Sequence, residues 1–325
     1  MEWKSYYRAE LEHPDVRATL TQMLHATGSG WLGTRKDIGM QLPDRAIVSF
    51  PHTAVAYSGS LQAQVVAELY QSGIQRVIAM GVLHSHGIEA FQHALDEMAP
   101  GLEREAAYEQ VSGGWLPDAT EFMSPFGKLE LAQPKPGDIL RIDTNGLLAH
   151  EFSLDTFLSI VRLGEEIYAC EPLEVFPIYV GMTRHPRGKG FETASLLARR
   201  VAELWDENTA VVATGDVVHY GTPYGPERVK SNNLEKHFRS QLEGSFARAL
   251  EDGNWPLAYR LAQTILQSDQ RELLPVLGNL LGGGIKQEIL AFSLSDYAPI
   301  FECAPPCVVA SALIAYLERG KGSVA

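Results

Sequence analysis

The sequence is poor in cysteine, in basic residues and in long apolar runs. Its 325 residues include 3 cysteines, which is too few for a disulfide framework and indicates a reducing compartment, the cytoplasm. No window approaches the ~20 consecutive apolar residues that a membrane span needs. The first residues carry no apolar stretch of the kind found in signal peptides. We therefore expect a cytoplasmic protein with no membrane partner.

Basic residues are outnumbered by acidic ones. The chain has 27 Lys and Arg against 40 Asp and Glu, for a net charge of -13. Because an acidic surface repels phosphate backbones, we expect no nucleic-acid partner. Hydrophobic residues make up 45% of the chain, which excludes disorder as a description of the whole. No composition shift marks a linker, so we predict a single domain over residues 1–325.

Short apolar runs rich in β-branched residues alternate with longer amphipathic runs. The short runs predict strands buried on both faces, namely Ala46–Phe50, Val77–Val82, Ile139–Ile142, Val175–Val180 and Ala210–Thr214. The long runs predict helices, namely Ser60–Gln71, Ser153–Cys170, Thr193–Asp206, Asn233–Leu250, Trp255–Gln267 and Pro306–Glu318. This alternation predicts a three-layer α/β fold with a largely parallel central sheet flanked by helices, and with a helical section at about residues 233–287.

Three of the predicted strands end in imidazole side chains. His52 follows the first strand, His84 follows the second, and Asp216 with His219 follows the last. If these strands are neighbours in the sheet, the side chains converge at one edge. Imidazole is the commonest metal ligand in proteins, so the pattern predicts a metal site built from loops.

Several details of this site stay open. His84 and His86 are two residues apart and could bind one ion together, but Gly87 indicates a turn and favours His84. Asp216 either caps a helix or orients His219, which is then a free acid or base near the metal.

The two cysteines near the end of the chain form a separate candidate. Two prolines between Cys303 and Cys307 predict the start of a helix. Cys307 then packs inward, whereas Cys303 precedes the helix, where amide groups favour a thiolate ligand. The string Gly28–Gly33 matches a dinucleotide-binding fingerprint, but it follows a predicted helix rather than a strand, so we reject it.

Six segments together resemble the Memo family, which includes the AmmeMemoRadiSam system protein B. The matching motifs occur in the family's order at Ser49–Gly59, Ile78–His84, Glu151–Asp155, Phe176–Gly181, Gly215–Gly221 and Cys303–Cys307. Each motif is weak alone, but six of them in the family's order make a moderately strong signal. The chain departs from the family pattern at three places, where it has Thr53-Ala54, Val82-Leu83 and Phe152.

The resemblance implies the fold of the class III extradiol ring-cleaving dioxygenases. It implies a metal site of His52, His84 and Cys303, with Asp216 and His219 as pocket residues and His219 in the place of the acid/base histidine. The dioxygenases have a glutamate where the family has cysteine.

The leading hypothesis is a mononuclear non-haem Fe(II)-dependent oxidoreductase that acts on a small aromatic or apolar substrate and O2. Tyr57 and Tyr220 are predicted hydrogen-bond donors in its pocket, and Phe152 makes that pocket drier. The alternative is a non-catalytic copper- or iron-binding or adaptor protein, because thiolate and imidazole also suit Cu(I). A third reading is a zinc-dependent hydrolase.

Overall fold

The structure is a computed structural model and describes residues 2–26, 45–84, 101–169, 171–186, 190–225 and 229–319. Two features singled out in the sequence lie outside the described residues, namely His86 and the Gly28–Gly33 string, and so does Cys170, the last residue of the predicted helix Ser153–Cys170.

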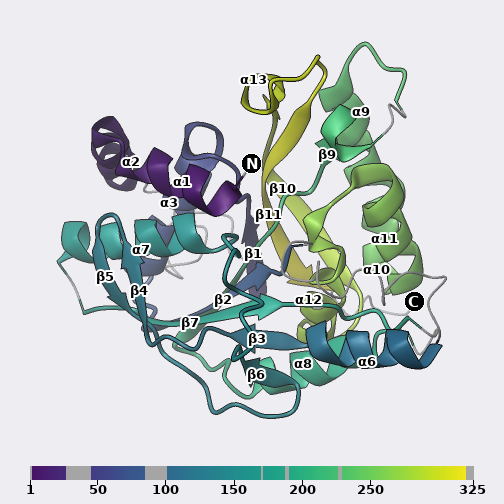
Figure 1. Ribbon diagram of the computed structural model, residues 1–325, viewed down its shortest axis with the longest axis horizontal. Helices are drawn as coiled ribbons and strands as arrows, with labels where there is room; N and C mark the ends of the chain where they lie inside the picture. The colour runs from purple at the N-terminus through teal and green to yellow at the C-terminus, as the bar shows by residue number, and fades with distance from the viewer. Residues whose placement is uncertain are drawn as a thin grey trace, which may run out of the picture.

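In the described part of the chain, nine strands form one mixed, largely parallel sheet, so the predicted α/β fold class is confirmed (Figure 1). Its middle consists of four parallel neighbours in the order β1 (Ala46–Phe50), β8 (Thr209–Thr214), β2 (Arg76–Val82) and β7 (Glu174–Val180). The other strands of the sheet are β3 (Gly114–Leu116), β6 (Leu140–Ile142), β9 (His219–Tyr220), β10 (Ile285–Asp296) and β11 (Val308–Glu318). All five predicted strands are present.

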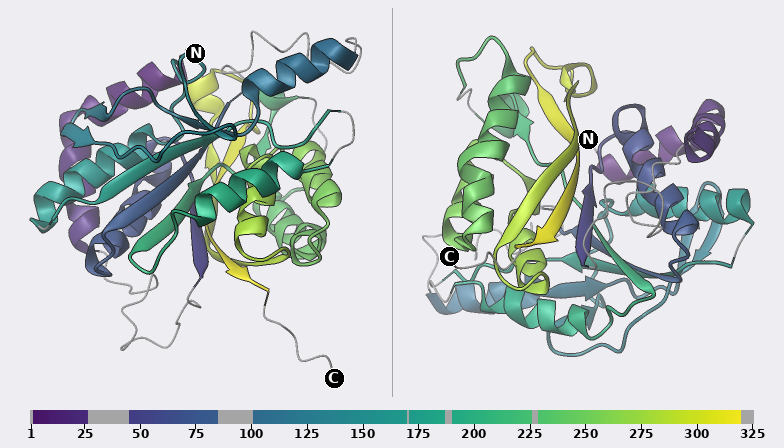
Figure 2. Two further views of the ribbon diagram at one scale, coloured as in Figure 1. Left: turned by 90° about the horizontal axis from the view of Figure 1, so that it is seen from below. Right: turned by 180° about the vertical axis from the view of Figure 1, so that it is seen from behind.

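Helices cover both faces of this sheet, which gives three layers (Figures 1 and 2). One face carries α1 (Trp3–Glu12), α2 (Pro14–Ala26), α3 (Val55–Gln71) and α7 (Asp155–Tyr168). The opposite face carries α8 (Glu192–Ala202), α9 (Leu234–Gln241), α10 (Ala247–Glu251), α11 (Trp255–Leu261) and α12 (Leu274–Leu280). The remaining elements are α6 (Gly101–Val111), α13 (Ala298–Phe301) and the hairpin of β4 (Glu121–Ser124) and β5 (Gly127–Glu130).

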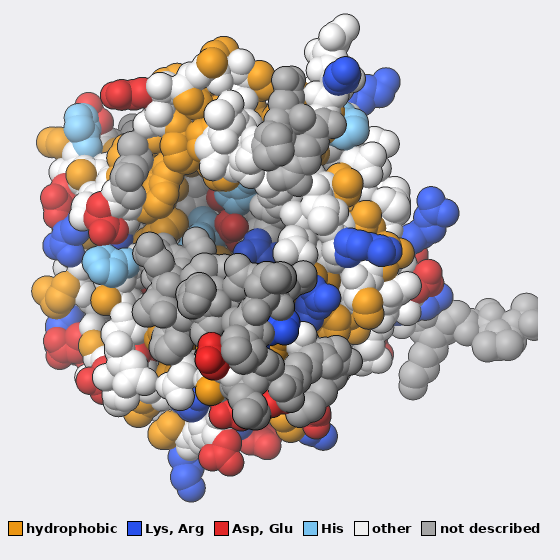
Figure 3. All heavy atoms as spheres, turned by 45° about the vertical axis from the view of Figure 1, so that its right-hand side comes forward, with side chains coloured by type: hydrophobic (Ala, Val, Ile, Leu, Met, Phe, Trp, Pro, Cys, Tyr) orange, Lys and Arg blue, Asp and Glu red, His pale blue; other side chains and the backbone are white. Residues whose placement is uncertain are grey.

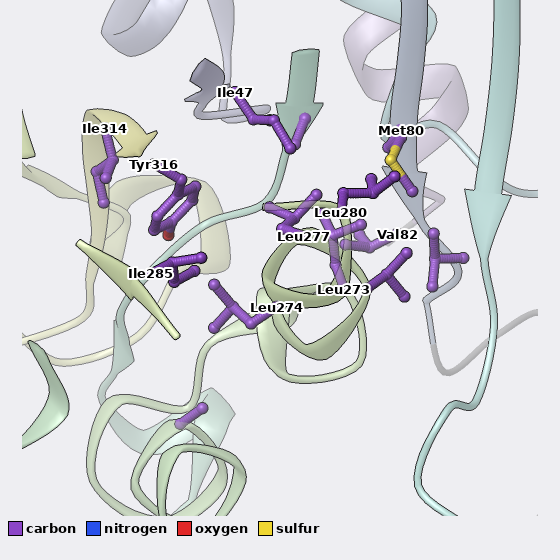
Figure 4. Close-up of a cluster of buried hydrophobic side chains, with 14 of the residues drawn as sticks. Ile47, Met80, Val82, Leu273, Leu274, Leu277, Leu280, Ile285, Ile314 and Tyr316 are labelled. Carbon is purple, nitrogen blue, oxygen red and sulfur yellow. The ribbon is translucent and has the colours of Figure 1, made fainter. Parts of the chain in front are cut away.

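Strand residues alternate between the two cores, as the period of a strand requires. On β1, Ile47 belongs to the core under α12, whereas Val48 belongs to the core under α3 and α7. Figure 4 shows how side chains of the α12 segment meet the strands, with Leu277 and Leu280 close to Met80. Each such fully buried side chain contributes roughly 1.5–3 kcal/mol to folding, so both faces hold the carboxyl ends of the parallel strands in place.

The prediction of a helix over Pro306–Glu318 is wrong, because this segment forms β11. The strand lies between β10 and β1 and pairs antiparallel with both. A run that is buried on both faces is apolar at nearly every position, so its periodicity does not distinguish a strand from a buried helix.

The predicted helical section is present but ends earlier than expected. It runs from α9 through α12 to Leu280, after which the chain enters β10 at Ile285. Of the helices that the structure describes, none combines the length and the apolar character that crossing a membrane requires.

Candidate metal centre

Three parallel strands deliver polar side chains to the same edge of the sheet. His52, Asp216 and His84 each follow the last residue of their strand by two positions, after β1, β8 and β2 respectively. Because β8 pairs with both β1 and β2, these three loops are adjacent. His219 joins them from β9, which pairs with β11.

A fourth segment completes the cluster with Asp269, which stands at the start of a short helical turn between α11 and α12. Its Oδ2 atom lies 3.3 Å from Nε2 of His52 and 3.7 Å from Nε2 of both His84 and His219. Oδ2 of Asp216 lies 3.7 Å from Nε2 of His52 and of His219. Asp269 therefore belongs to two possible ligand sets, one with His52 and His84 and one with Asp216 and His219.

Each imidazole is oriented by an acceptor for its outer nitrogen. Nδ1 of His84 lies 2.9 Å from Glu151, and Nδ1 of His219 lies 2.8 Å from the carbonyl oxygen of Gln267. Nδ1 of His52 lies 3.3 Å from Oγ1 of Thr214, whose own hydrogen goes to the Phe50 carbonyl. Because these partners accept, Nδ1 is the donor in all three rings.

This arrangement points the three Nε2 atoms at the two aspartates. In a neutral ring with a protonated Nδ1, Nε2 carries a lone pair, so each ring in its neutral form can bind a cation through that atom. Metal-binding histidines usually have this kind of outer partner, because it fixes the tautomer and the ring orientation.

The carboxylates favour positive charge in the cluster. Burial alone would lower the pKa of His84, but Glu151 and Asp269 outweigh it and raise that pKa to about 10. Burial would raise the pKa of Glu151, but its interactions with His84 hold it at about 2. The pKa of Asp269 is held well below its usual range, against burial, chiefly by the imidazoles. For Asp216, burial raises the pKa, and Asp269 adds to this by repulsion.

One acceptor atom of the cluster has no well-formed hydrogen bond. Among the described residues, Oδ2 of Asp269 is buried and accepts no hydrogen bond of acceptable geometry. A buried carboxylate oxygen without a partner is costly. Ligand atoms held about 2.1 Å from one metal ion lie roughly 3.0–3.4 Å apart, close to the 3.3 Å and 3.7 Å separations found here. The residues present therefore fit a divalent metal ion.

The turn that carries Asp269 is fixed on both sides. The fully buried amide of Gln270 donates to Oγ of Ser49 and to the carbonyl of Gly215, both at 2.7 Å. Glu272 accepts from Oγ1 of Thr183 and from the hydroxyl of Tyr259. A side chain at Gly215, which has φ of 151°, would lie 2.5 Å from Cγ of Gln270, so glycine allows this close approach.

The cluster lies in a cavity of about 450 Å³, a size that suits a small organic ligand. Six aromatic side chains line it: Trp3, Tyr7, Phe152, Tyr224, Tyr297 and Phe301. Figure 3 looks into the hollow, with hydrophobic side chains on its wall and imidazole and acidic groups in its depth. The ring of Phe152 stacks on His84, with centroids 4.4 Å apart. The cavity therefore combines an apolar wall with a polar, cation-binding floor.

The structure brings four of the predicted residues together, namely His52, His84, Asp216 and His219, but it does not bring Cys303 to them. No ligand group found among the described residues contains this thiol. Cys303 follows α13 in the connection between β10 and β11, where its amide donates to the carbonyl of Ala298. The predicted helix start does not exist here, because Cys307 leads directly into the strand β11. The anionic group common to both possible ligand sets is the carboxylate of Asp269, whereas the family resemblance implies the thiolate of Cys303.

The two tyrosines predicted as pocket donors lie elsewhere. The hydroxyl of Tyr57 donates to the carbonyl of Asp296, and Tyr220 is buried with its hydroxyl on the carbonyl of Val229. Neither lines the cavity, whereas Tyr7, Tyr224 and Tyr297 do.

The sequence pattern does not reveal Asp269, and it places Glu151 in a family-like motif with no indicated role. Ser268–Glu272 reads as a short polar stretch between two apolar helices, and only its break in the helical pattern could have marked it as a loop. Glu151 precedes a predicted helix, where an acidic residue is most often read as part of a cap.

Comparison with known proteins adds no assignment: no family model matches the chain, and no curated protein matches it either.

Proposed function

We propose that the chain is a mononuclear non-haem iron-dependent oxygenase or oxidoreductase that acts on a small aromatic substrate in the cytoplasm. The observation that carries the proposal is Oδ2 of Asp269, which is buried without a hydrogen bond of acceptable geometry opposite Nε2 of His52 and His84. Two histidines and one carboxylate are the ligand set typical of non-haem Fe(II) oxygenases. The sequence resemblance to the Memo family, which implies the fold of the extradiol dioxygenases, supports the same class.

The donor set also weighs against the copper-binding alternative. Cu(I) prefers soft thiolate and thioether ligands. The cluster has imidazole, which also suits copper, but it offers carboxylate in place of thiolate. An Fe(II) ion at this place would supply open coordination positions and the redox chemistry for activating O2.

Protein side chains supply the rest of the proposed chemistry. His219 donates from Nδ1 to the carbonyl of Gln267 and directs Nε2 to the cavity floor. In this tautomer Nε2 accepts a proton from a substrate hydroxyl and later returns it. Asp216, 3.7 Å from that nitrogen, stabilises the protonated ring. The aromatic wall holds the substrate ring and limits the access of water.

The test is oxygen consumption by the Fe(II)-loaded protein with a panel of phenols and catechols. We expect turnover in the wild type and a loss of at least about 100-fold in His219→Ala, with the iron content retained. His25→Ala, an exposed histidine in the last turn of α2, is the matched control and should leave turnover unchanged. Turnover that needs no O2, or tight Cu(I) binding without turnover, would replace this proposal with a hydrolase or a metal-binding protein.

A further inference from the structure

Arg271 is the one cavity-lining residue in the described part of the chain that carries a permanent positive charge. It ends the short helical turn that begins with Asp269, so the cation and the metal-binding carboxylate belong to one rigid segment. Figure 3 shows basic side chains beside the imidazole and acidic groups of the hollow.

This guanidinium has donors to spare. Its Nη1 donates to the carbonyl of Ser268 at 3.1 Å, and no described carboxylate forms an ion pair with Arg271. A guanidinium carries five N–H donors, so this one bond leaves most of them available. The neighbouring acid, Glu272, is occupied by Thr183, the amide of Arg184 and Tyr259.

Acidic groups surround the cation-binding floor. Asp216 and Asp269 lie on it, and Glu151 lies behind His84. These three carboxylates offset the charge of a divalent ion on the floor, so Arg271, with its permanent charge, is the group on the wall that favours an anionic ligand. Guanidinium groups bind carboxylates through two parallel hydrogen bonds, and the aromatic wall supplies contacts for a ring. The available donors and the apolar wall together match a molecule with one ring and one carboxylate.

We propose that Arg271 is the specificity-determining residue of this cavity and that the substrate is an aromatic carboxylic acid. The inference rests on the proposed function in taking this cavity as the substrate site. It goes further in assigning the charge of the substrate and the residue that selects it.

The test compares 3-phenylpropionate with its neutral amide by calorimetry, using the full-length chain both Zn(II)-loaded and metal-free. We expect the acid to bind at least about tenfold more tightly than the amide, as a charge-assisted hydrogen bond allows. Arg271→Gln should abolish this preference. Arg271→Lys, which keeps the charge but loses the planar fork, should retain part of it. The exposed Arg260, outside the cavity lining, gives the matched control Arg260→Gln, which should keep the full preference.

Equal binding of acid and amide by the wild type, or an undiminished preference in Arg271→Gln, would overturn the assignment. Thermal melting and metal content of each variant separate a lost subsite from a disturbed Asp269 turn. If Arg271→Gln disturbs that turn, the Lys variant decides, because loss of the preference in a folded, metal-binding Lys variant also contradicts the assignment. If the protein binds metal normally but shows no preference for the acid, the role of Arg271 is refuted and the proposed function stands. If it prefers the acid but binds no metal, the proposed function is refuted and the role of Arg271 stands.

Discussion

Replacing Asp269 by asparagine removes one charge and almost no volume from the metal centre. The amide keeps the shape of the carboxylate, so the turn fixed by Gln270 and Glu272 should stay in place. What changes is Oδ2, the atom that both possible ligand sets share. We expect the variant to fold normally and to bind metal poorly.

The size of the loss follows from the ligand count. Zinc sites with four protein ligands contribute about 10–16 kcal/mol in small peptides, which is roughly 3 kcal/mol for each ligand. Losing one ligand should therefore weaken the metal affinity by about two orders of magnitude. At a free metal concentration about 100 times the wild-type Kd, the wild type gains about 2.7 kcal/mol of stability from the metal, and the variant should gain a few tenths.

The assay is a thermal melt with and without Fe(II) or Zn(II), combined with a competition titration against a chelator. Asp252→Asn changes an exposed acid after α10 and should behave as the wild type. Cys303→Ser should also retain the metal. If Asp269→Asn binds metal as well as the wild type while Cys303→Ser loses it, our assignment of the ligands is refuted.

Three further changes test the supports of the site. Glu151→Gln keeps the shape beside His84 but removes its charge, and should weaken metal affinity about 10–100-fold in a chelator titration; unchanged affinity would contradict the role of Glu151. Gly215→Ala places a methyl group 2.5 Å from a side chain of the Asp269 turn and should lower both the melting temperature and the metal affinity. Gly146 also has a positive φ, of 78°, but has open space around it. Gly146→Ala should therefore lower the melting temperature and leave the metal affinity unchanged. Burial raises the pKa of Asp155 to about 6, so its ionisation opposes folding. The free energy of unfolding of Asp155→Asn should therefore match that of the wild type below about pH 4. As the pH rises through 6, the variant should become the more stable of the two, by up to about 3 kcal/mol. Urea unfolding at several pH values measures this, and a difference between the two proteins that does not change with pH would refute it.

The layers of the fold follow from the sequence because strands buried on both faces leave a strong pattern. The runs that form β1, β2, β7 and β8 are short, apolar and rich in β-branched residues, and a loop follows each of them. The segment of β11 has the same composition but is longer and follows two prolines, which also mark helix starts. Its partner β10 precedes it by a short connection, but its other partner, β1, lies more than 250 residues away in the sequence. A local pattern does not contain the pairing with β1.

The site was predictable to the extent that it depends on strand order. His52, His84 and Asp216 stand directly after strands, so a parallel sheet alone brings them near one another. Asp269 reaches the same place only because a helical section folds back over the sheet and Gln270 docks on Ser49. That contact spans more than 200 residues, and no spacing in the sequence encodes it.

Anomalous diffraction from a crystal of the Fe(II)-loaded protein tests the central claim most directly. We predict one strong iron peak about 2.0–2.2 Å from Nε2 of His52, Nε2 of His84 and Oδ2 of Asp269. An iron peak at Cys303, or no peak in this cavity at saturating metal, would contradict the account.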